Sequence, residues 1–341
     1  DFVHAVVCNS GVANACTGTE GMKYCEDMAE ATAKALNVGK DEVLVASTGV
    51  IGAQLPMDKI TKGIEMLVPE LNDTVDGGHN AALAIMTTDT VKKEMAMEMS
   101  IDGKTVTVGG IAKGSGMIHI NMGTMLSFVT TDCAISSKML EEALKEAVED
   151  SYNMVSVDGD TSTNDTLAIM ASGKAGNKEI TTKNEDYKTF VAGLTEAFKS
   201  LAKQLAKDGE GATKLLICDV SGAKTKKDAV GVAKTVIGSS LVKTAMFGAD
   251  ANWGRVLCAI GYSGMDVDIS KVKVTFKSEG GEVLVCEDGA GVGFDEDEAK
   301  KVLSCDTVII NIELNDGEGF AEAYGCDLTY DYVKINGDYR T

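Results

Sequence analysis

The stretch Lys93–Gly116, KEMAMEMSIDGKTVTVGGIAKGSG, decides the fold class. It reads as two strands joined at Asp102-Gly103, and Asp-Gly between two such runs is a strong hairpin signal. The stretch therefore predicts an antiparallel pair. A hairpin within a chain that also contains helical segments argues against a purely doubly wound parallel sheet and favours mixed sheets with helical cover.

Strand and helix patterns alternate before this stretch. They predict a buried strand at 3–8, a second strand at 42–47 and an amphipathic helix at 57–71 introduced by Pro56. Between the two strands, 19–38 predicts a helix with one apolar face formed by Met22, Cys25, Met28, Ala29, Ala33 and Leu36.

The rest of the chain mixes strands with helices. Further strands are predicted at 126–131, 214–219, 272–278, 282–287 and 306–313, and helices at 138–151, 185–207, 224–237 and 294–303. The predicted fold class is α+β (mixed α/β), a layered sandwich of mixed sheets covered by helices.

Composition excludes several function classes. The 341 residues are 44% apolar, with 32 Lys and Arg against 52 Asp and Glu, a formal net charge of −20. This charge repels a phosphate backbone, so no nucleic-acid partner is expected; an acidic balance can favour a cationic small substrate but is more often a solubility feature. No apolar run approaches the roughly 18 residues of a membrane span, and the start lacks a signal-like core, which predicts a cytoplasmic protein.

The nine cysteines are widely spread, odd in number and without a C-x-x-C pair, so neither a disulfide framework nor a zinc site is indicated. Most, such as Cys218 and Cys258, are predicted to be buried reduced thiols. None of the three histidines, His4, His79 and His119, has a metal-binding spacing. The sequence thus predicts neither metal chemistry nor a Ser/His/Asp triad.

Five short stretches rich in Gly, Ser, Thr and Asn are predicted to be loops beside strands, where sites are usually built. They are NSGVANACTG (9–18), ASTGVIG (46–52), TTDT (87–90), DGDTSTNDT (158–166) and GADANWGR (248–255). The alternative for each is a capped turn, as at Ser47 and Thr48. A nucleotide-binding loop is not indicated, because GGIAKGSG lacks the order G-x-x-x-x-G-K-[ST] and no helical run follows it.

Thr124, in KGSGMIHINMGTML (113–126), raises a chemical question. A threonine hydroxyl is a poor nucleophile without a base, and His119, five residues away on an extended segment, would point to the opposite face. A threonine at a chain terminus can instead use its own α-amine as the base. That would require cleavage of the Gly123-Thr124 bond; the alternative is an ordinary strand start after a turn.

At this point the chain resembles a known family, the ornithine acetyltransferases, or glutamate N-acetyltransferases, of arginine biosynthesis. The matching motifs are NSGVANACTG, ASTGVIGAQLPMDKI, AIMTTDT, KGSGMIHINMGTMLSF, SVDGDTSTNDT, DGEGATK, GADANWGR and CDLTYDYVKINGDYRT. The resemblance implies a precursor that cuts itself into an α chain, 1–123, and a β chain, 124–341, whose terminal Thr124 is the nucleophile. It also implies an α₂β₂ heterotetramer, and that residues preceding the first motif in the family are missing here.

The resemblance assigns roles to individual residues. Thr48 and Gly49 form the implied oxyanion hole, and the implied substrate contacts are Thr87, Lys113, Thr124, Glu210, Asn336 and Thr341. We infer that Lys113 suits a substrate carboxylate and Glu210 an amino group. The chain departs from the family pattern at three positions: Val12 stands for Asn, Gly123 for Ala and Ala251 for Pro.

The implied reaction is a ping-pong acetyl transfer from N-acetyl-L-ornithine to L-glutamate through an acetyl-threonine, without metal or organic cofactor. Some family members also take acetyl-CoA as the donor, which the sequence does not decide. One alternative is a self-processing hydrolase, an aminopeptidase or amidohydrolase, in which water replaces glutamate. A second is a non-catalytic amino-acid-binding protein that is never cleaved.

Overall fold

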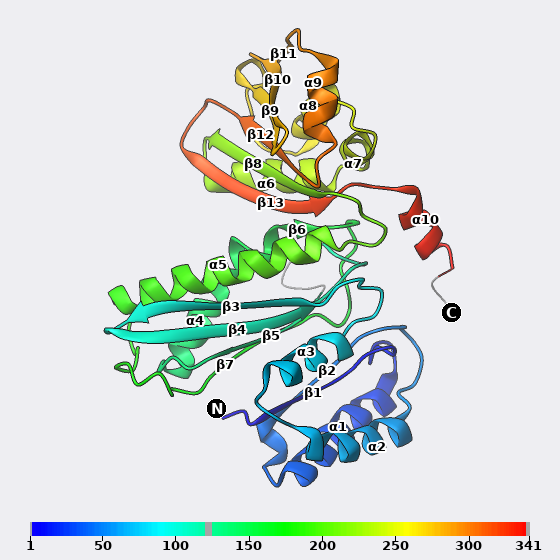
Figure 1. Cartoon of the computed structure of the whole chain (residues 1–341), viewed down its shortest axis with the longest axis vertical. Coiled ribbons are helices and arrows are strands. Elements are labelled where there is room, and N and C mark those ends of the chain that lie inside the picture. Colours follow the sequence, from blue (N-terminus) through cyan, green and yellow to red (C-terminus); the bar gives the residue numbers. More distant parts are fainter. Residues whose placement is uncertain (1, 120–124, 339–341) are drawn as a thin grey trace.

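The computed structural model describes residues 2–119 and 125–338. Its elements are stacked in tiers along the long axis of the molecule (Figure 1). The tier that contains the N-terminal residues has a two-stranded parallel sheet flanked by helices. Its elements are β1 (Ala5–Asn9), α1 (Gly18–Leu36), β2 (Val43–Ser47), α2 (Met57–Leu67) and α3 (Val75–Ala84).

The middle tier is a four-stranded mixed sheet in the order β3-β4-β5-β7. Its strands are β3 (Lys93–Ile101), β4 (Lys104–Lys113), β5 (Leu126–Thr131) and β7 (Thr166–Ala171). Asp102 and Gly103, with φ of 51° and 70°, form the predicted hairpin turn between β3 and β4. Two helices cover this sheet, α4 (Ser137–Glu149) and α5 (Glu185–Lys207).

The third tier is a seven-stranded mixed sheet in the order β11-β10-β9-β12-β8-β13-β6. In chain order its strands are β6 (Val155–Ser156), β8 (Leu215–Ala223), β9 (Lys273–Ser278), β10 (Gly281–Glu287), β11 (Ala290–Gly291), β12 (Thr307–Glu313) and β13 (Gly319–Cys326). The helices of this part of the chain are α6 (Lys226–Gly238), α7 (Ser240–Phe247), α8 (Trp253–Tyr262), α9 (Glu296–Leu303) and α10 (Tyr330–Asn336).

Helix α5 joins the two larger sheets into one core. Its Leu201 lies against Gly110 of β4, where a Cβ would be 3.3 Å from a Leu201 methyl carbon. Its Lys203 contacts β13, 2.9 Å from Glu322 and over the ring of Tyr324. Because successive side chains of a strand point to opposite faces, Gly325, which lies against Ile237 of α6, faces the other way. Helices α5 and α6 therefore cover opposite faces of the seven-stranded sheet.

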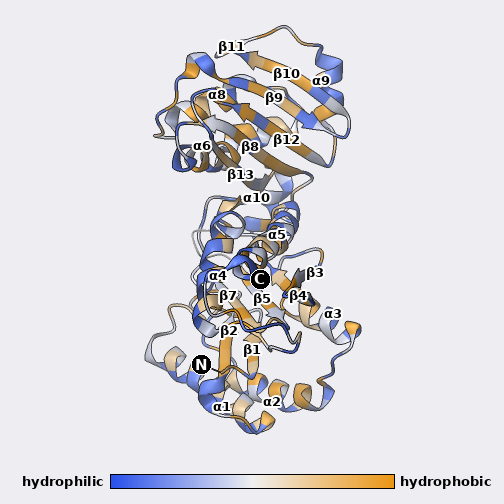
Figure 2. Cartoon of the chain, turned by 90° about the vertical axis from the view of Figure 1, so that its left-hand side faces the viewer, coloured by the Kyte–Doolittle hydropathy of each residue, from blue (hydrophilic) through white to orange (hydrophobic). Residues whose placement is uncertain are grey.

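Burial follows this layering. One hydrophobic cluster spans both larger sheets and includes the fully buried Phe190, Phe198 and Phe276, whereas Ala29, Ala33 and Val43 form a small separate cluster under α1. Figure 2 shows hydrophobic residues concentrated along the strands of the seven-stranded sheet. The tier at the N-terminal end therefore has the smallest core of the three.

Most of the predicted elements are confirmed, including mixed sheets under helical cover. Several details were wrong. The first strand is only half-buried, and Met22 of α1 is 69% exposed. The prediction that most cysteines are buried was wrong: Cys258 is an exposed thiol on α8, and only four of the nine are buried, Cys133, Cys218, Cys286 and Cys326. The predicted loop 248–255 also contains the start of helix α8 at Trp253.

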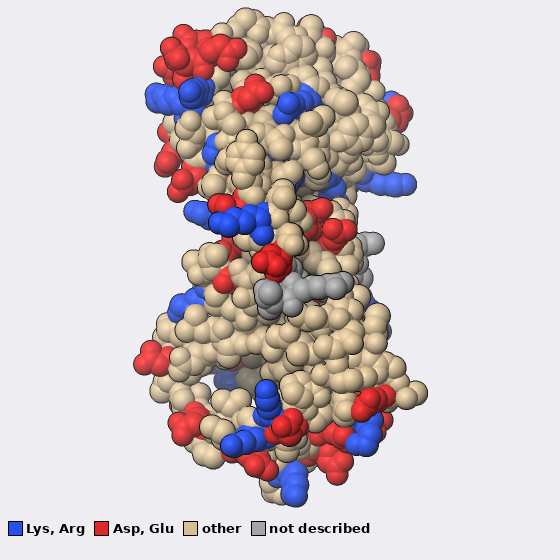
Figure 3. Space-filling model, turned by 90° about the vertical axis from the view of Figure 1, so that its right-hand side faces the viewer, with Lys and Arg blue, Asp and Glu red and all other residues tan. Residues whose placement is uncertain are grey.

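Figure 3 shows acidic and basic side chains interspersed over one face, with no continuous basic area there. Within the described residues, no single helix is long and apolar enough to cross a membrane, and the bent pair α6 and α7 passes that test only when taken together.

Candidate active site

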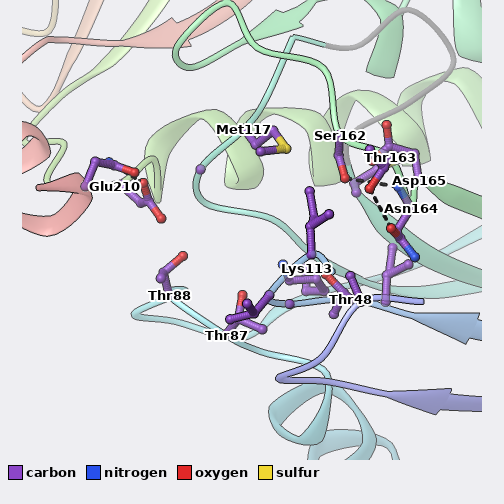
Figure 4. A pocket seen from close by; sticks show the side chains of 18 residues that line it. Thr48, Thr87, Thr88, Lys113, Met117, Ser162, Thr163, Asn164, Asp165 and Glu210 are labelled. Carbon is purple, nitrogen blue, oxygen red and sulfur yellow. Dashed lines mark hydrogen bonds between the residues drawn. The ribbon is translucent and has the colours of Figure 1, made fainter. Parts of the chain in front are cut away.

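A cavity of about 310 Å³ lies where several segments from residues 13 to 210 meet, together with Asn336 near the end of the chain. It is lined by the segment after β2, the loop before β3, the end of β4, the start of β5, the loop before β7 and the residues after α5 (Figure 4). Six residues predicted as site residues line it together: Thr48, Gly49, Thr87, Lys113, Glu210 and Asn336. Residues up to 288 positions apart in the sequence thus share one small space.

Three predicted site residues, Gly123, Thr124 and Thr341, lie outside the described residues. Met125, which follows Thr124 in the sequence, does line the cavity. Met125, the first described residue of the predicted β chain, therefore lines the same cavity as the six other predicted site residues.

The segment 48–50 is held against the loop after β1. The N–H of Thr48 donates to the carbonyl of Asn9 at 3.0 Å, and that of Val50 to Gly11 at 3.1 Å. Gly49 has φ of +129°, and a Cβ there would lie 2.2 Å from the carbonyl carbon of Gly11. A residue with a side chain would be strained at this φ and would clash with Gly11. The local backbone geometry therefore explains why glycine follows Thr48.

Lys113 ends β4, and its side chain is buried at the cavity wall. Its Nζ lies 3.9 Å from Oδ2 of Asp89. Burial lowers the pKa of the Lys113 ammonium group, an effect that the Asp89 carboxylate opposes. Lys113 therefore presents a poorly hydrated cation, which favours an anionic group of a ligand.

A buried ion network that the sequence did not reveal supports this wall. Lys93 is fully buried and bridges Asp89, at 2.7 Å, and Asp208, at 2.5 Å. Asp89 also accepts from the N–H groups of Gly114, at 2.8 Å, and Thr87, at 3.1 Å. Burial would raise the pKa of Asp89, but Lys93, Lys113 and the Gly114 N–H hold it below its ordinary value.

Asp208, the second carboxylate that pairs with Lys93, is the C-cap residue of α5 and also holds the loop before β3. It accepts from the backbone N–H groups of Thr90, at 3.0 Å, and Val91, at 3.3 Å. The network thereby ties the Thr87 loop to the segment that carries Glu210. No sequence spacing could indicate it, since Asp208 is 115 residues from Lys93.

Glu210 lies at the opposite end of the cavity from the 162–165 loop (Figure 4). It is buried, and its Oε2 accepts from Nδ2 of Asn336 at 2.7 Å. Gly116 makes room for this carboxylate, since a Cβ there would lie 2.3 Å from it. The short helix α10 thus brings Asn336 to the cavity through its contact with Glu210.

A further carboxyl group, Asp165, lines the cavity and was not among the predicted site residues. Its interactions with the Met125 N–H, the Ser162 hydroxyl and Lys113 lower its pKa, but burial outweighs them and raises the pKa to about 7. The only sequence signal was its position in the polar stretch 158–166. His119, by contrast, hydrogen-bonds to Ser156 at 3.0 Å and does not line the cavity.

The arrangement suits a small charged molecule. Lys113 offers a cation and Glu210 an anion, and Thr48, Thr87 and Ser162 contribute uncharged hydroxyl-bearing side chains to the same lining. A volume near the lower end for ligand pockets fits a compact molecule with both charges, such as an amino acid. Among the described residues, no cluster of three or more His, Cys, Asp or Glu side chains could hold a metal ion.

Comparison with known proteins is consistent with this picture. The model of the ArgJ family matches residues 1–341. The arginine biosynthesis bifunctional protein ArgJ 1 of Clostridium acetobutylicum is 53% identical over 339 residues, covering 99% of this chain and 83% of that protein. The ArgJ of Caldanaerobacter subterraneus subsp. tengcongensis is 52% identical over 337 residues, with the same coverage. The solved structure of arginine biosynthesis bifunctional protein argJ from Bacillus halodurans is 47% identical, with a TM-score of 0.60, and covers 63% of this chain and 99% of that one. The chain belongs to the ArgJ family.

Proposed function

We propose that this protein is a glutamate N-acetyltransferase of arginine biosynthesis. It transfers the acetyl group of N-acetyl-L-ornithine to L-glutamate through an acetyl ester on Thr124. The proposal rests on one observation above all: within a chain of the ArgJ family, six site residues implied by the resemblance, far apart in the sequence, line a single cavity beside Met125.

The reaction follows from the chemistry of the proposed groups. The α-amine of Thr124 takes the proton from the threonine hydroxyl as the oxygen attacks the acetyl carbonyl. The Thr48 hydroxyl and the Gly49 N–H stabilise the tetrahedral oxyanion; loss of one donor from an oxyanion hole typically costs about 2.7 to 4 kcal/mol. Ornithine leaves, and glutamate then takes the acetyl group from the ester.

Charge complementarity supports the proposed binding mode. Lys113 binds a substrate carboxylate, and Glu210 binds the amino group of ornithine or glutamate. Thr87, Asn336 and Thr341 complete the proposed contacts. Acetyl-CoA as a second donor would fit the word "bifunctional" in the names of the relatives.

Maturation is part of the proposal. Cleavage of the Gly123-Thr124 bond divides the precursor into chains 1–123 and 124–341, which assemble as a cytoplasmic heterotetramer of two α and two β chains. The 218 residues from 124 to 341 are 64% of the chain, close to the 63% that the solved relative covers. This agreement in length supports a separate β chain.

Intact-mass analysis and an acetyl-transfer assay test the proposal together. The purified protein should give two fragments, the larger beginning at Thr124, and should transfer acetyl from N-acetylornithine with parallel-line, ping-pong kinetics. Thr124→Ala should abolish both cleavage and transfer. A wild-type chain that stays intact, or a Thr124→Ala variant as active as wild type, would overturn it.

The same assay separates transfer from hydrolysis. A transferase releases ornithine in an amount that matches the N-acetylglutamate formed. Ornithine release that neither requires nor responds to glutamate would instead identify the self-processing hydrolase. An uncleaved protein that binds ornithine without turnover would identify a binding protein.

A further inference from the structure

Asp89 lies directly behind the wall of the cavity. Its side chain is fully buried and does not line the cavity. Its Oδ2 accepts from the N–H of Thr87 at 3.1 Å and lies 3.9 Å from Nζ of Lys113. Thr87 and Lys113 both line the cavity (Figure 4). One carboxylate oxygen therefore faces two of the proposed substrate contacts.

The other oxygen of this carboxylate fixes its orientation. Oδ1 of Asp89 accepts from Nζ of Lys93 at 2.7 Å and from the N–H of Gly114 at 2.8 Å. Lys93 is held in turn by Asp208, at 2.5 Å. Because Gly114 follows Lys113 in the chain, Asp89 holds the backbone beside Lys113 as well as attracting its ammonium group.

The contact between Asp89 and Lys113 is electrostatic. A separation of 3.9 Å is longer than a hydrogen bond, so Asp89 does not occupy the N–H groups of the ammonium group. Burial lowers the pKa of Lys113, and the charge of Asp89 is the strongest influence that raises it. Without Asp89, Lys113 would lose its proton at a lower pH.

The other titratable groups around Lys113 are weaker influences on its charge. They are Lys93 of β3, Cys8 of β1, Glu210 after α5 and Asp165 before β7. Lys93 is a like charge, which lowers the pKa of Lys113. Burial raises the pKa of Cys8 to about 12, so this thiol is uncharged at neutral pH. Asp89 is therefore the main anion that favours the ammonium form of Lys113.

We propose that Asp89 is a positioning residue for substrate binding: it holds the Thr87 backbone beside the Lys113 ammonium group and keeps that group cationic for a substrate carboxylate. This inference rests on the proposed function, in which Lys113 binds such a carboxylate. Asp89 acts through Thr87 and Lys113 and does not itself touch the substrate. Lys93 contributes by fixing the Asp89 carboxylate from behind.

The pH dependence of KM tests this role. Asp89→Asn keeps the shape of the side chain but removes its charge. Its KM for N-acetylornithine should begin to rise at a lower pH than in wild type, whereas kcat should change much less. Above that point KM should rise by up to about tenfold per pH unit, because the charged fraction of Lys113 falls by that factor.

Two further variants separate charge from a general loss of structure. Lys113→Arg, alone or combined with Asp89→Asn, should remove the rise of KM, because a guanidinium group stays protonated over this range. Asp208→Asn is the matched control, since it removes the other carboxylate that pairs with Lys93 but does not face Lys113. It should lower the free energy of unfolding and leave the pH at which KM rises as in wild type.

Chemical labelling measures the charge of Lys113 without turnover. Acetic anhydride reacts with neutral amines and not with ammonium groups, so labelling of Lys113 in the folded chain, read by peptide mass spectrometry, follows its titration. Labelling should begin at a lower pH in Asp89→Asn than in wild type. Circular dichroism must show that Asp89→Asn folds. If it does not, Lys93→Met/Asp208→Asn decides: loss of the like charge should move the onset of labelling to a higher pH.

The outcomes distinguish this inference from the proposed function. Labelling and KM profiles of folded Asp89→Asn that match wild type overturn the role of Asp89 and leave the transferase proposal standing. If the double variant has to decide, an unmoved onset of labelling overturns that role equally. A wild-type protein that transfers no acetyl group overturns the proposed function, and with it the substrate carboxylate at Lys113, whatever the labelling shows.

Discussion

Removal of the Lys93 ammonium group should destabilise the protein strongly. Lys93 is fully buried and forms ion pairs of 2.7 and 2.5 Å with two buried carboxylates. Lys93→Met keeps the length and apolar volume but leaves Asp89 and Asp208 without their shared counter-charge. Breaking a buried pair in this way costs about 3–5 kcal/mol, so the free energy of unfolding should fall by that amount.

Urea unfolding followed by circular dichroism measures the effect. Lys188→Met, which removes an exposed ion pair on α5, is the control and should unfold at the wild-type urea concentration. The double variant Lys93→Met/Asp208→Asn removes one of the two stranded charges and should recover part of the loss. A cost below about 1 kcal/mol for Lys93→Met would refute the reasoning, because the stranded carboxylates would then be compensated by other groups.

The stability loss of Lys93→Met should depend on pH. The folded pKa of Asp89 lies below its unfolded value of about 3.9, so its ionisation stabilises the wild-type fold above that pH, and this contribution is lost as the pH falls through the folded pKa. Lys93→Met removes the largest charge that lowers this pKa. Its stability loss should therefore be greatest at neutral pH and shrink in acid, as Asp89 takes up a proton.

Three further substitutions test the cavity. Gly116→Ala places a Cβ 2.3 Å from the Glu210 carboxylate and should raise the KM for ornithine-type substrates with little effect on the urea midpoint. Gly49→Ala combines φ of +129° with a Cβ 2.2 Å from Gly11, and should lower the free energy of unfolding by about 1–3 kcal/mol or more and reduce kcat. Lys113→Ala should spare chain cleavage, seen by intact mass, while raising the KM of the transfer reaction.

Elements with strong local signals were predictable from the sequence. Strand β5 and helix α5 have the predicted bounds, 126–131 and 185–207, because β-branched residues or a long apolar stripe decide their conformation locally. Strand β13, GFAEAYGC, was missed because Gly and Ala have little strand preference. It is a strand through its pairing with β8, whose paired residues lie 96 to 111 positions earlier, a separation that no local pattern spans.

The site was predictable only where motifs resembled a family. Thr48, Gly49 and Lys113 were found in this way, and the structure places them at one cavity. Lys93 and Asp165 were missed because their significance lies in burial and in partners far away in the sequence. Cys258 was predicted to be buried because its sequence neighbours are apolar. Those neighbours face the core from α8, but the Cys258 thiol is exposed on the other side of the helix.

The pairing of β4 with β5 determines whether the two proposed chains stay associated after cleavage. Lys113 lies opposite Leu126, and the register continues to Val108 opposite Thr131, so the two strands on either side of residues 123–124 are neighbours in one sheet. Both proposed chains also supply the cavity wall, with Thr48 from one and Glu210 from the other. Cutting the covalent connection therefore leaves two polypeptides that share one folding unit. They should co-elute under native conditions and separate only on unfolding, and neither gene half should be able to supply activity without the other.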